Sequence, residues 1–281
     1  DLFRDVPRSA MLDKPVDLPL HASEMAVTRL ISSYADGNIA AGSVPFFLGA
    51  GAYRHHIPAS VDHIIQRGEF LTSYTPYQPE IAQGTLQYLF EFQTQVARLF
   101  AMDVANASLY DGSTATLEAI LMASRVTKRK KALISAGLHP HYVDVARSMT
   151  AYSDDELIIN DPKLNLGAPG DDTDILSDQI DDETSCVVVQ YPNVFGHISD
   201  FTDLGRRARE KGALLVVIVT EPVALGAIRA PGDMGADIVA GEGQSIGVGL
   251  QFGGPYLGLF ATKQKYVRQM PGRLCGETKD A

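Results

Sequence analysis

The sequence has 281 residues, of which 45% are hydrophobic and 21% charged, and its formal net charge is -10 at pH 7. These values are typical of a globular protein with enough apolar residues for a large core. The negative charge, and the lack of any stretch that combines clustered Lys or Arg with aromatic residues, argue against a nucleic-acid-binding protein. The longest strongly apolar run, 213–219, is too short to cross a bilayer, and the N-terminus shows no signal pattern. We therefore expect a cytoplasmic protein with no membrane contact.

The first 45 residues predict an extended arm followed by a helix. Three prolines before residue 20 favour extended backbone. Ser23 predicts the start of a helix, and Gly37 predicts a left-handed end. Four apolar residues recur at helical spacing and are interpreted as core: Val27, Leu30, Ile31 and Tyr34.

Residues 46–83 read as a long irregular segment rich in Gly, Pro, Tyr and His. A loop of this length is usually functional. Beyond it, a helix is expected with an apolar face formed by Leu86, Leu89, Phe90, Ala97 and Phe100.

After Asn106 the pattern alternates between helices and short apolar strands. Helices are expected from Ser113, over 142–149, near Asp178, over 202–211 and from Lys263. Strands are expected over 132–134, 157–159, 186–190, 214–219, near Ile238 and over 257–261. This alternation predicts an α/β fold with a mostly parallel sheet and helices on both faces. We expect residues 46–281 to form one large α/β domain, and a following small domain to be missing from this chain.

Several common site motifs are absent. The stretch Gly241-Glu-Gly243-Gln-Ser-Ile-Gly247 lacks the third glycine of a dinucleotide-binding fingerprint, because Ile246 stands there. The paired histidines 55–56 and 139/141 are interpreted as loop residues with local hydrogen bonds, and no metal cluster is predicted. Two cysteines give no disulfide framework. The basic run 128–131 is interpreted as the end of a helix.

Residues Asp111-Gly112-Ser113-Thr114 stand at the start of a predicted helix. Free amides and hydroxyls there can hold an anion such as a cofactor phosphate. Capping of the helix by Asp111 or Ser113 explains the same residues without a ligand. The two interpretations have about equal support in the sequence.

Several motifs, in one order along the chain, resemble the N-terminal half of glycine decarboxylases, the P-proteins of the glycine cleavage system. They are Phe47-Leu-Gly-Ala-Gly-Ala-Tyr53, Tyr74-Thr-Pro-Tyr77-Gln78-Pro-Glu80, Gln83-Gly-Thr-Leu86, Asn106-Ala-Ser-Leu109, the Gly112-Ser-Thr114 turn, Pro231-Gly-Asp-Met-Gly-Ala-Asp237 and Phe252-Gly-Gly-Pro255. The resemblance covers nearly the whole chain. It is similar to the alpha subunits of those members whose two halves are separate chains.

The resemblance implies the fold of fold type I pyridoxal-phosphate enzymes, of which aspartate aminotransferase is a member. It also implies a reaction in which glycine loses its carboxylate as carbon dioxide and its aminomethyl group passes to the lipoyl arm of the H-protein. The implied partner is a beta subunit in an α2β2 assembly.

Aligned on the Pro231 turn and Asp237, the position of the family's Schiff-base lysine falls at Ser245, and serine cannot form an imine. Ile218 falls where an aspartate would face the pyridine nitrogen, with Thr220 and Glu221 beyond it. The nine lysines lie in helix ends, loops or termini: Lys14, Lys128, Lys130, Lys131, Lys163, Lys211, Lys263, Lys265 and Lys279. We therefore expect pyridoxal phosphate on the beta subunit and no catalytic residue in this chain.

Five residues of the irregular segment are candidates for reaching the partner's active site: Tyr53, Arg54, Tyr74, Tyr77 and Gln78. Packing of an interface is the alternative role for each. Residues Gly112, Ser113 and Thr114 are a possible vestigial phosphate loop. Two other functions stay open, an autonomous pyridoxal-phosphate lyase or transferase that uses another lysine, and a non-catalytic nucleotide-binding or scaffolding module.

Overall fold

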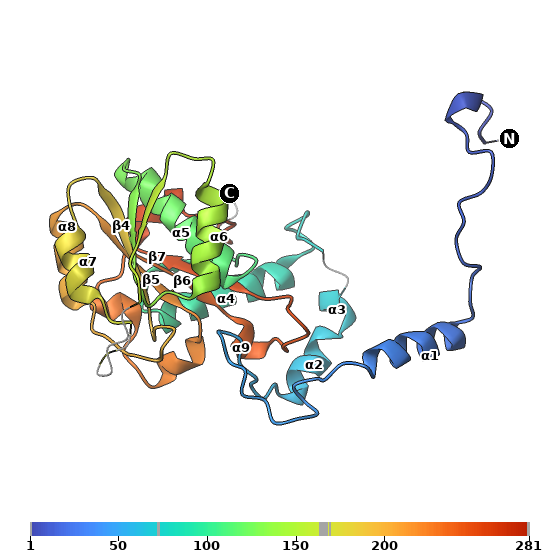
Figure 1. Ribbon diagram of the computed structural model, residues 1–281, viewed down its shortest axis with the longest axis horizontal. Coiled ribbons are helices and arrows are strands. Elements are labelled where there is room, and N and C mark those ends of the chain that lie inside the picture. The colour runs from blue at the N-terminus through green and yellow to red at the C-terminus, as the bar shows by residue number, and fades with distance from the viewer. Residues whose placement is uncertain (1, 72–73, 163–167, 169, 280–281) are drawn as a thin grey trace. The chain divides into compact units, whose positions relative to one another are not determined.

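The structure is a computed structural model that describes residues 2–71, 74–162, 168 and 170–279 (Figure 1). It divides into two compact units, Asp1–Phe46 and Phe47–Ala281. Lys163 lies outside the described residues.

The first unit contains a short 3-10 helix, η1 (Arg8–Ala10), and helix α1 (Glu24–Ala35). Ser23 caps α1 as predicted, because its side chain accepts a hydrogen bond from the Ala26 N–H. The predicted end is wrong: Asp36 closes the helix with right-handed dihedrals, and Gly37 has no positive φ.

The prediction that the apolar stripe of α1 is core is also wrong. Its four residues, Val27, Leu30, Ile31 and Tyr34, are 46% to 65% exposed. Helical periodicity predicts that a face is apolar, but it does not provide the surface that would cover it.

The second unit carries the sheet and its helices. Its α-helices are α2 (Ala59–Ile65), α3 (Gly68–Leu71), α4 (Gln83–Leu99), α5 (Gly112–Thr127), α6 (Pro140–Thr150), α7 (Thr173–Gln179), α8 (Thr202–Glu210) and α9 (Gln244–Gly247). Its 3-10 helices are η2 (Pro222–Gly226), η3 (Pro231–Met234) and η4 (Gln264–Gln269). Its strands are β1 (Val104–Ala105), β2 (Lys131–Ile134), β3 (Glu156–Ile159), β4 (Thr184–Gln190), β5 (Leu214–Val219), β6 (Ile238–Glu242) and β7 (Gly258–Thr262).

The strands form a single seven-stranded sheet in the order β1-β7-β6-β5-β4-β2-β3. Neighbouring strands from β3 to β6 pair in parallel, whereas β7 is antiparallel to both β6 and β1. Helices α7 and α8 lie on one face of the sheet and α5 and α6 on the other (Figure 1). The prediction of a mostly parallel sheet covered on both faces is confirmed.

Strand β5 shows how the core is built on both faces. Leu215, Val217 and Val219 belong to the cluster that includes residues of α4, α7 and α8. The alternate residues of β5 belong to the cluster that includes residues of α5 and α6. All six side chains of the strand are buried, and each contributes roughly 1.5–3 kcal/mol by leaving water. A strand that is apolar at every position is therefore the expected signature of this central location.

The local predictions differ from the structure at four places. The irregular segment 46–83 contains α2 and α3, the short strand β1 was not predicted, and the helix expected from Lys263 is the 3-10 helix η4. Of the basic run, only Lys128 closes α5, in a left-handed conformation. Lys130 and Lys131 instead pair with Asp155 and Asp181.

Three features of the described residues concern thiols, long apolar helices and groups of metal-binding side chains. Both cysteines in this part of the chain are free thiols. Its helices include none that is long and apolar enough to pass through a bilayer. Its His, Cys, Asp and Glu side chains form no group of three or more that could hold a metal ion.

Candidate functional site

The carboxyl ends of the parallel strands carry the polar residues of the candidate site. Ligands of open α/β sheets bind at this edge, where loops and helix N-termini converge. Glu221 follows β5, Glu242 ends β6, and Ser245 lies in α9, just beyond β6. Gly112 begins α5 beside them.

The N-terminus of α5 is capped by Asp111. Its Oδ1 atom accepts hydrogen bonds from the Ser113 and Thr114 N–H groups, at 2.8 and 3.0 Å. Both hydroxyls also donate to this carboxylate. Burial raises the pKa of Asp111, but these hydrogen bonds outweigh it and leave the pKa below its ordinary value. Of the two interpretations of this turn, the structure therefore supports capping.

A second carboxylate, that of Glu242, closes the same helix end. Glu242 is 5% exposed. Its Oε2 accepts from the Gly112 N–H at 2.9 Å, and its Oε1 accepts from the Gln244 and Leu257 N–H groups at 2.9 Å each. Burial, with a smaller contribution from the charge of Asp111, holds the pKa of Glu242 above its ordinary value, although the hydrogen bonds from the three amides oppose this shift. Because both oxygens face N–H donors, the geometry is that of an ionised carboxylate.

Gly112 is packed too closely to accept a side chain. A Cβ atom there would lie 2.3 Å from the Tyr142 hydroxyl and 3.0 Å from Glu242 Cβ. Burial and the charge of Glu242 raise the pKa of Tyr142. Tyr142 therefore stays a neutral phenol that fills the space above the helix end.

Ser245 is tied to the end of β5. Its hydroxyl donates to Glu221 Oε1 at 2.8 Å, and the His55 imidazole donates from Nε2 to Glu221 Oε2 at 2.8 Å. Glu221 thus joins Ser245 to the segment around His55. Ile218, by contrast, is fully buried within β5 and does not reach this cluster.

The segment 49–56 lies over the same edge of the sheet. His139 is 5% exposed, and its Nδ1 accepts from the His141 N–H, so that the proton resides on Nε2. That Nε2–H donates to the Ala50 carbonyl at 2.8 Å. A Cβ on Gly51 would come within 3.0 Å of the His139 ring, which shows how closely the segment is packed there.

The prediction that the paired histidines make only local hydrogen bonds is therefore wrong for two of them. His139 bonds to a residue 89 positions away, and His55 to one 166 positions away. Both histidines fasten the segment 49–56 to the sheet.

These residues do not fit pyridoxal phosphate, the cofactor that the fold family implies. The amides of Gly112, Ser113 and Thr114, which would have to receive its phosphate, already donate to carboxylates of this chain. The Asp111 and Glu242 carboxylates therefore occupy the place where the cofactor's phosphate would have to bind. Position 245 holds a serine. Among the described lysines, Lys263 is held by the buried Asp237 carboxylate at 2.7 Å, and Lys130 by the buried Asp155 carboxylate at 3.3 Å.

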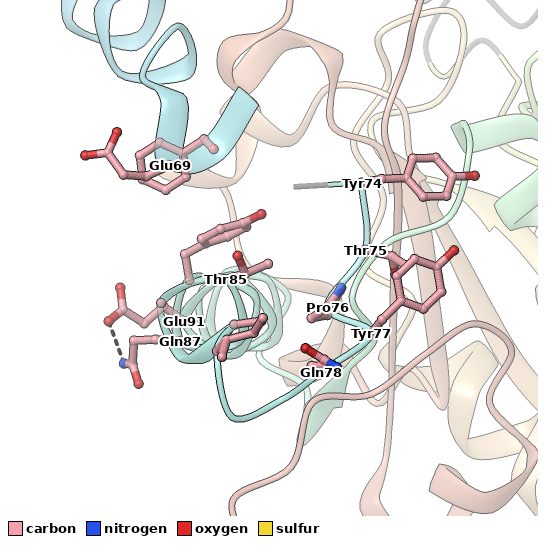
Figure 2. A pocket seen from close by; sticks show the side chains of 14 residues that line it. Glu69, Tyr74, Thr75, Pro76, Tyr77, Gln78, Thr85, Gln87 and Glu91 are labelled. Atoms are coloured by element: carbon pink, nitrogen blue, oxygen red, sulfur yellow. Dashed lines mark hydrogen bonds between the residues drawn. The ribbon is translucent and has the colours of Figure 1, made fainter. Parts of the chain in front are cut away.

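The aromatic part of the irregular segment borders an open groove. This groove has a volume of about 900 Å³ and lies between α3, α4 and residues 74–78. Tyr74 and Tyr77 are 92% and 79% exposed, and Figure 2 shows both rings on the side of their segment away from α4. A second groove, of about 600 Å³, is bordered by Tyr74, Tyr110 and residues 272–275.

The other predicted residues lie along the segment 49–56. The ring of Tyr53 approaches Gly49, and Arg54 borders a shallow hollow of about 430 Å³ with residues 55–57. The structure thus joins Gly112 to the buried Glu242 carboxylate and Ser245 to the partly exposed Glu221 carboxylate, and it leaves Tyr74, Tyr77 and Gln78 at the surface.

Sequence reasoning missed Glu242 and the contacts of His139. One signal was available for Glu242: it is a charged residue that directly follows the apolar run 238–241, at the carboxyl end of a strand. Its partner Gly112 is 130 residues away, and no local pattern links the two.

The model of the family described as glycine cleavage system P-protein matches residues 1–281. A protein of Rhizorhabdus wittichii, named probable glycine dehydrogenase (decarboxylating) subunit 1, is 70% identical over 100% of this chain and 62% of its own length. A protein of the same name from Sphingopyxis alaskensis is 68% identical with the same coverage. This chain therefore spans less than two thirds of the length of these relatives.

Two solved structures share the fold. A crystal structure of the glycine decarboxylase (P-protein) of the glycine cleavage system, in inhibitor-bound form, matches 99% of this chain and 61% of its own, with 42% identity and a TM-score of 0.90. Sphingosine-1-phosphate lyase from Burkholderia pseudomallei matches 94% of this chain and 64% of its own, with 16% identity and a TM-score of 0.64. The architecture is that of the large domain of fold type I pyridoxal-phosphate enzymes.

Proposed function

Because this chain belongs to the family of glycine cleavage system P-proteins, we propose that it works as subunit 1, the alpha subunit, of a two-subunit glycine dehydrogenase (decarboxylating). The pyridoxal phosphate and the Schiff-base lysine then belong to subunit 2. The relatives from Rhizorhabdus wittichii and Sphingopyxis alaskensis carry the name of subunit 1.

One observation carries the assignment of the cofactor to the partner. The helix end that would hold a phosphate is filled by the chain's own Asp111 and Glu242 carboxylates. The hydroxyl of Ser245, where the family's lysine is expected, is bound to Glu221. A chain with this arrangement supports the reaction without holding its cofactor.

The exposed aromatic segment supports an architectural role. Tyr74, Tyr77 and Ile81 are each at least 79% exposed beside the groove. Exposed apolar groups gathered in one place mark interaction surfaces. We assign this surface to contact with subunit 2, in an α2β2 assembly in which residues 74–78, with Tyr53 and Arg54, reach the partner's active site.

The remaining parts of the proposal follow from the family. Subunit 2 would decarboxylate glycine and pass the aminomethyl group to the lipoyl arm of the H-protein, in the cytoplasm. Within this chain, residues 1–45 form an arm and a helix and 46–281 the large domain. A smaller C-terminal domain completes the subunit.

The test uses full-length subunit 1 and subunit 2, alone and mixed, with pyridoxal phosphate. Subunit 1 alone should show no cofactor absorbance, and borohydride should fix the label to a subunit 2 peptide in the mixture. Subunit 1 with Ser245→Lys should still bind no cofactor, because the helix end stays filled. Label on any lysine of subunit 1 would contradict the proposal and favour an autonomous enzyme. Tight binding of a nucleotide without affinity for subunit 2 would favour a scaffolding module.

A further inference from the structure

The Glu242 carboxylate occupies a site built for an anion. It accepts hydrogen bonds from three backbone N–H groups: those of Gly112 and Leu257 are 130 and 15 positions away in the chain, and that of Gln244 is two positions ahead. One of them is the first amide of the 16-residue helix α5, whose N-terminus carries positive partial charge. Amides that converge on one point in this way form the usual receptor for a phosphate or carboxylate group.

We infer that Glu242 is a built-in anion that excludes phosphate groups from the N-terminus of α5. It is therefore the residue that closes this chain to phosphorylated cofactors. The inference rests on the proposed function, since it explains how subunit 1 stays free of the cofactor. It goes beyond the missing lysine, because a serine at 245 removes the covalent bond to a cofactor but leaves its phosphate site intact.

Geometry distinguishes the roles of the two carboxylates. Asp111 bonds only within its own turn, to residues two and three positions ahead, which is ordinary capping. Glu242 reaches the helix end from β6, and little room is left beside it, since a Cβ on Gly112 would lie 3.0 Å from Glu242 Cβ and 2.3 Å from the Tyr142 hydroxyl. Removing Asp111 uncaps a helix, whereas removing Glu242 uncovers three converging amides around an empty space.

The experiment measures the thermal unfolding temperature of full-length subunit 1 in inorganic phosphate, acetate or chloride at equal ionic strength. Glu242→Ala deletes a fragment of the size of acetate. The matched control is Glu118→Ala, which removes a partly exposed glutamate from α5, the helix whose N-terminus Glu242 covers. A second variant, Glu242→Gln, keeps the space filled while it removes the charge.

Glu242→Ala should unfold at a lower temperature in chloride, and phosphate or acetate should restore most of the loss with a saturable dose dependence. The unchanged protein, Glu118→Ala and Glu242→Gln should show no response specific to either anion. Loss of stability without recovery in either anion would overturn the inference, and so would a phosphate response of the unchanged protein that Glu242→Ala does not increase.

If Glu242→Ala does not fold in chloride, refolding from urea in phosphate replaces the melt. Recovery of folded protein in phosphate but not in chloride supports the inference, and failure in both overturns it. The readout is independent of the labelling test. Label on subunit 1 would refute the proposed function, whereas failed anion rescue with label on subunit 2 would refute only the role of Glu242.

Discussion

The N-terminus of α5 and the segment 74–78 are the two regions that the sequence marks as sites, and the structure treats them in opposite ways. At the helix end, the donors of Gly112, Ser113 and Thr114 all meet a carboxylate of the same chain. Along the segment, Tyr74 and Tyr77 lie exposed beside an open groove (Figure 2). The chain's own carboxylates thus close the helix end, whereas the segment 74–78 stays open at the surface, where the proposed function places contact with subunit 2.

The largest effect is expected at the closed region, from Gly112→Ala. The new Cβ would overlap the Tyr142 hydroxyl, so that the free energy of unfolding should fall by about 3 kcal/mol. Urea unfolding at pH 7 measures it. Tyr142→Phe in the same chain should recover part of the loss.

The control for this change is Gly84→Ala, because a Cβ at Gly84 in α4 meets nothing within 4 Å. Gly84→Ala should leave the free energy of unfolding unchanged or raise it by about 0.5–1 kcal/mol. Equal effects of the two substitutions would show that the helix end of α5 is not closely packed.

A smaller effect is expected from Asp111→Ala, which removes the cap of α5. The loss should be about 1 kcal/mol at pH 7. In the folded protein the pKa of Asp111 lies below its ordinary value of 3.8. The ionised carboxylate therefore stabilises the fold fully at pH values above 3.8, and this stabilisation is lost as the pH falls through the folded pKa. The difference in free energy of unfolding between Asp111→Ala and the unchanged protein should therefore become smaller as the pH falls below about 4. Urea unfolding at several pH values measures this difference. A difference that stays constant with pH would contradict a cap formed by an ionised Asp111.

A comparable or smaller effect is expected from Glu221→Ala, which frees Ser245 and His55 at once. The free energy of unfolding should fall by roughly 1 kcal/mol. Trypsin should also cleave faster after Arg54, because the segment 49–56 loses one of its attachments to the sheet. Mass spectrometry of timed digests measures the cleavage. Ser245→Ala is the control, because it removes one hydrogen bond and leaves His55 attached.

The smallest effect on stability is expected at the open region. Tyr74→Ala and Tyr77→Ala should change the free energy of unfolding by less than about 0.5 kcal/mol. Each should weaken pairing with subunit 2 by about tenfold or more, as measured by titration calorimetry. Tyr152→Ala, at another fully exposed tyrosine, serves as the control. If both variants bind subunit 2 with unchanged affinity, Tyr74 and Tyr77 do not contribute to the interface.

The sequence was most informative where one residue's environment follows from its neighbours in the chain. The apolar run of β5 gave the strand with its observed ends, because a strand buried on both faces is apolar at every position. Ser23 marked the start of α1 in the same local way. These elements place the carboxyl edge of the sheet, and with it the region of the site.

Prediction failed where the partner of a residue is remote. The contact of Glu242 with Gly112 spans 130 positions and that of His55 with Glu221 spans 166, and no periodicity records them. The stripe of α1 failed for another reason. Its apolar spacing is real, but the described structure leaves Leu30 and Ile31 about half exposed.

The three amides around Glu242 also bear on how the subunit responds to nutrition. A protein that binds a cofactor gains stability in proportion to the logarithm of the free cofactor concentration. A site that is filled by its own side chain gains nothing from that supply. Under the proposed function, the stability of isolated subunit 1 should therefore not depend on vitamin B6, and any dependence of the assembled enzyme should enter through subunit 2.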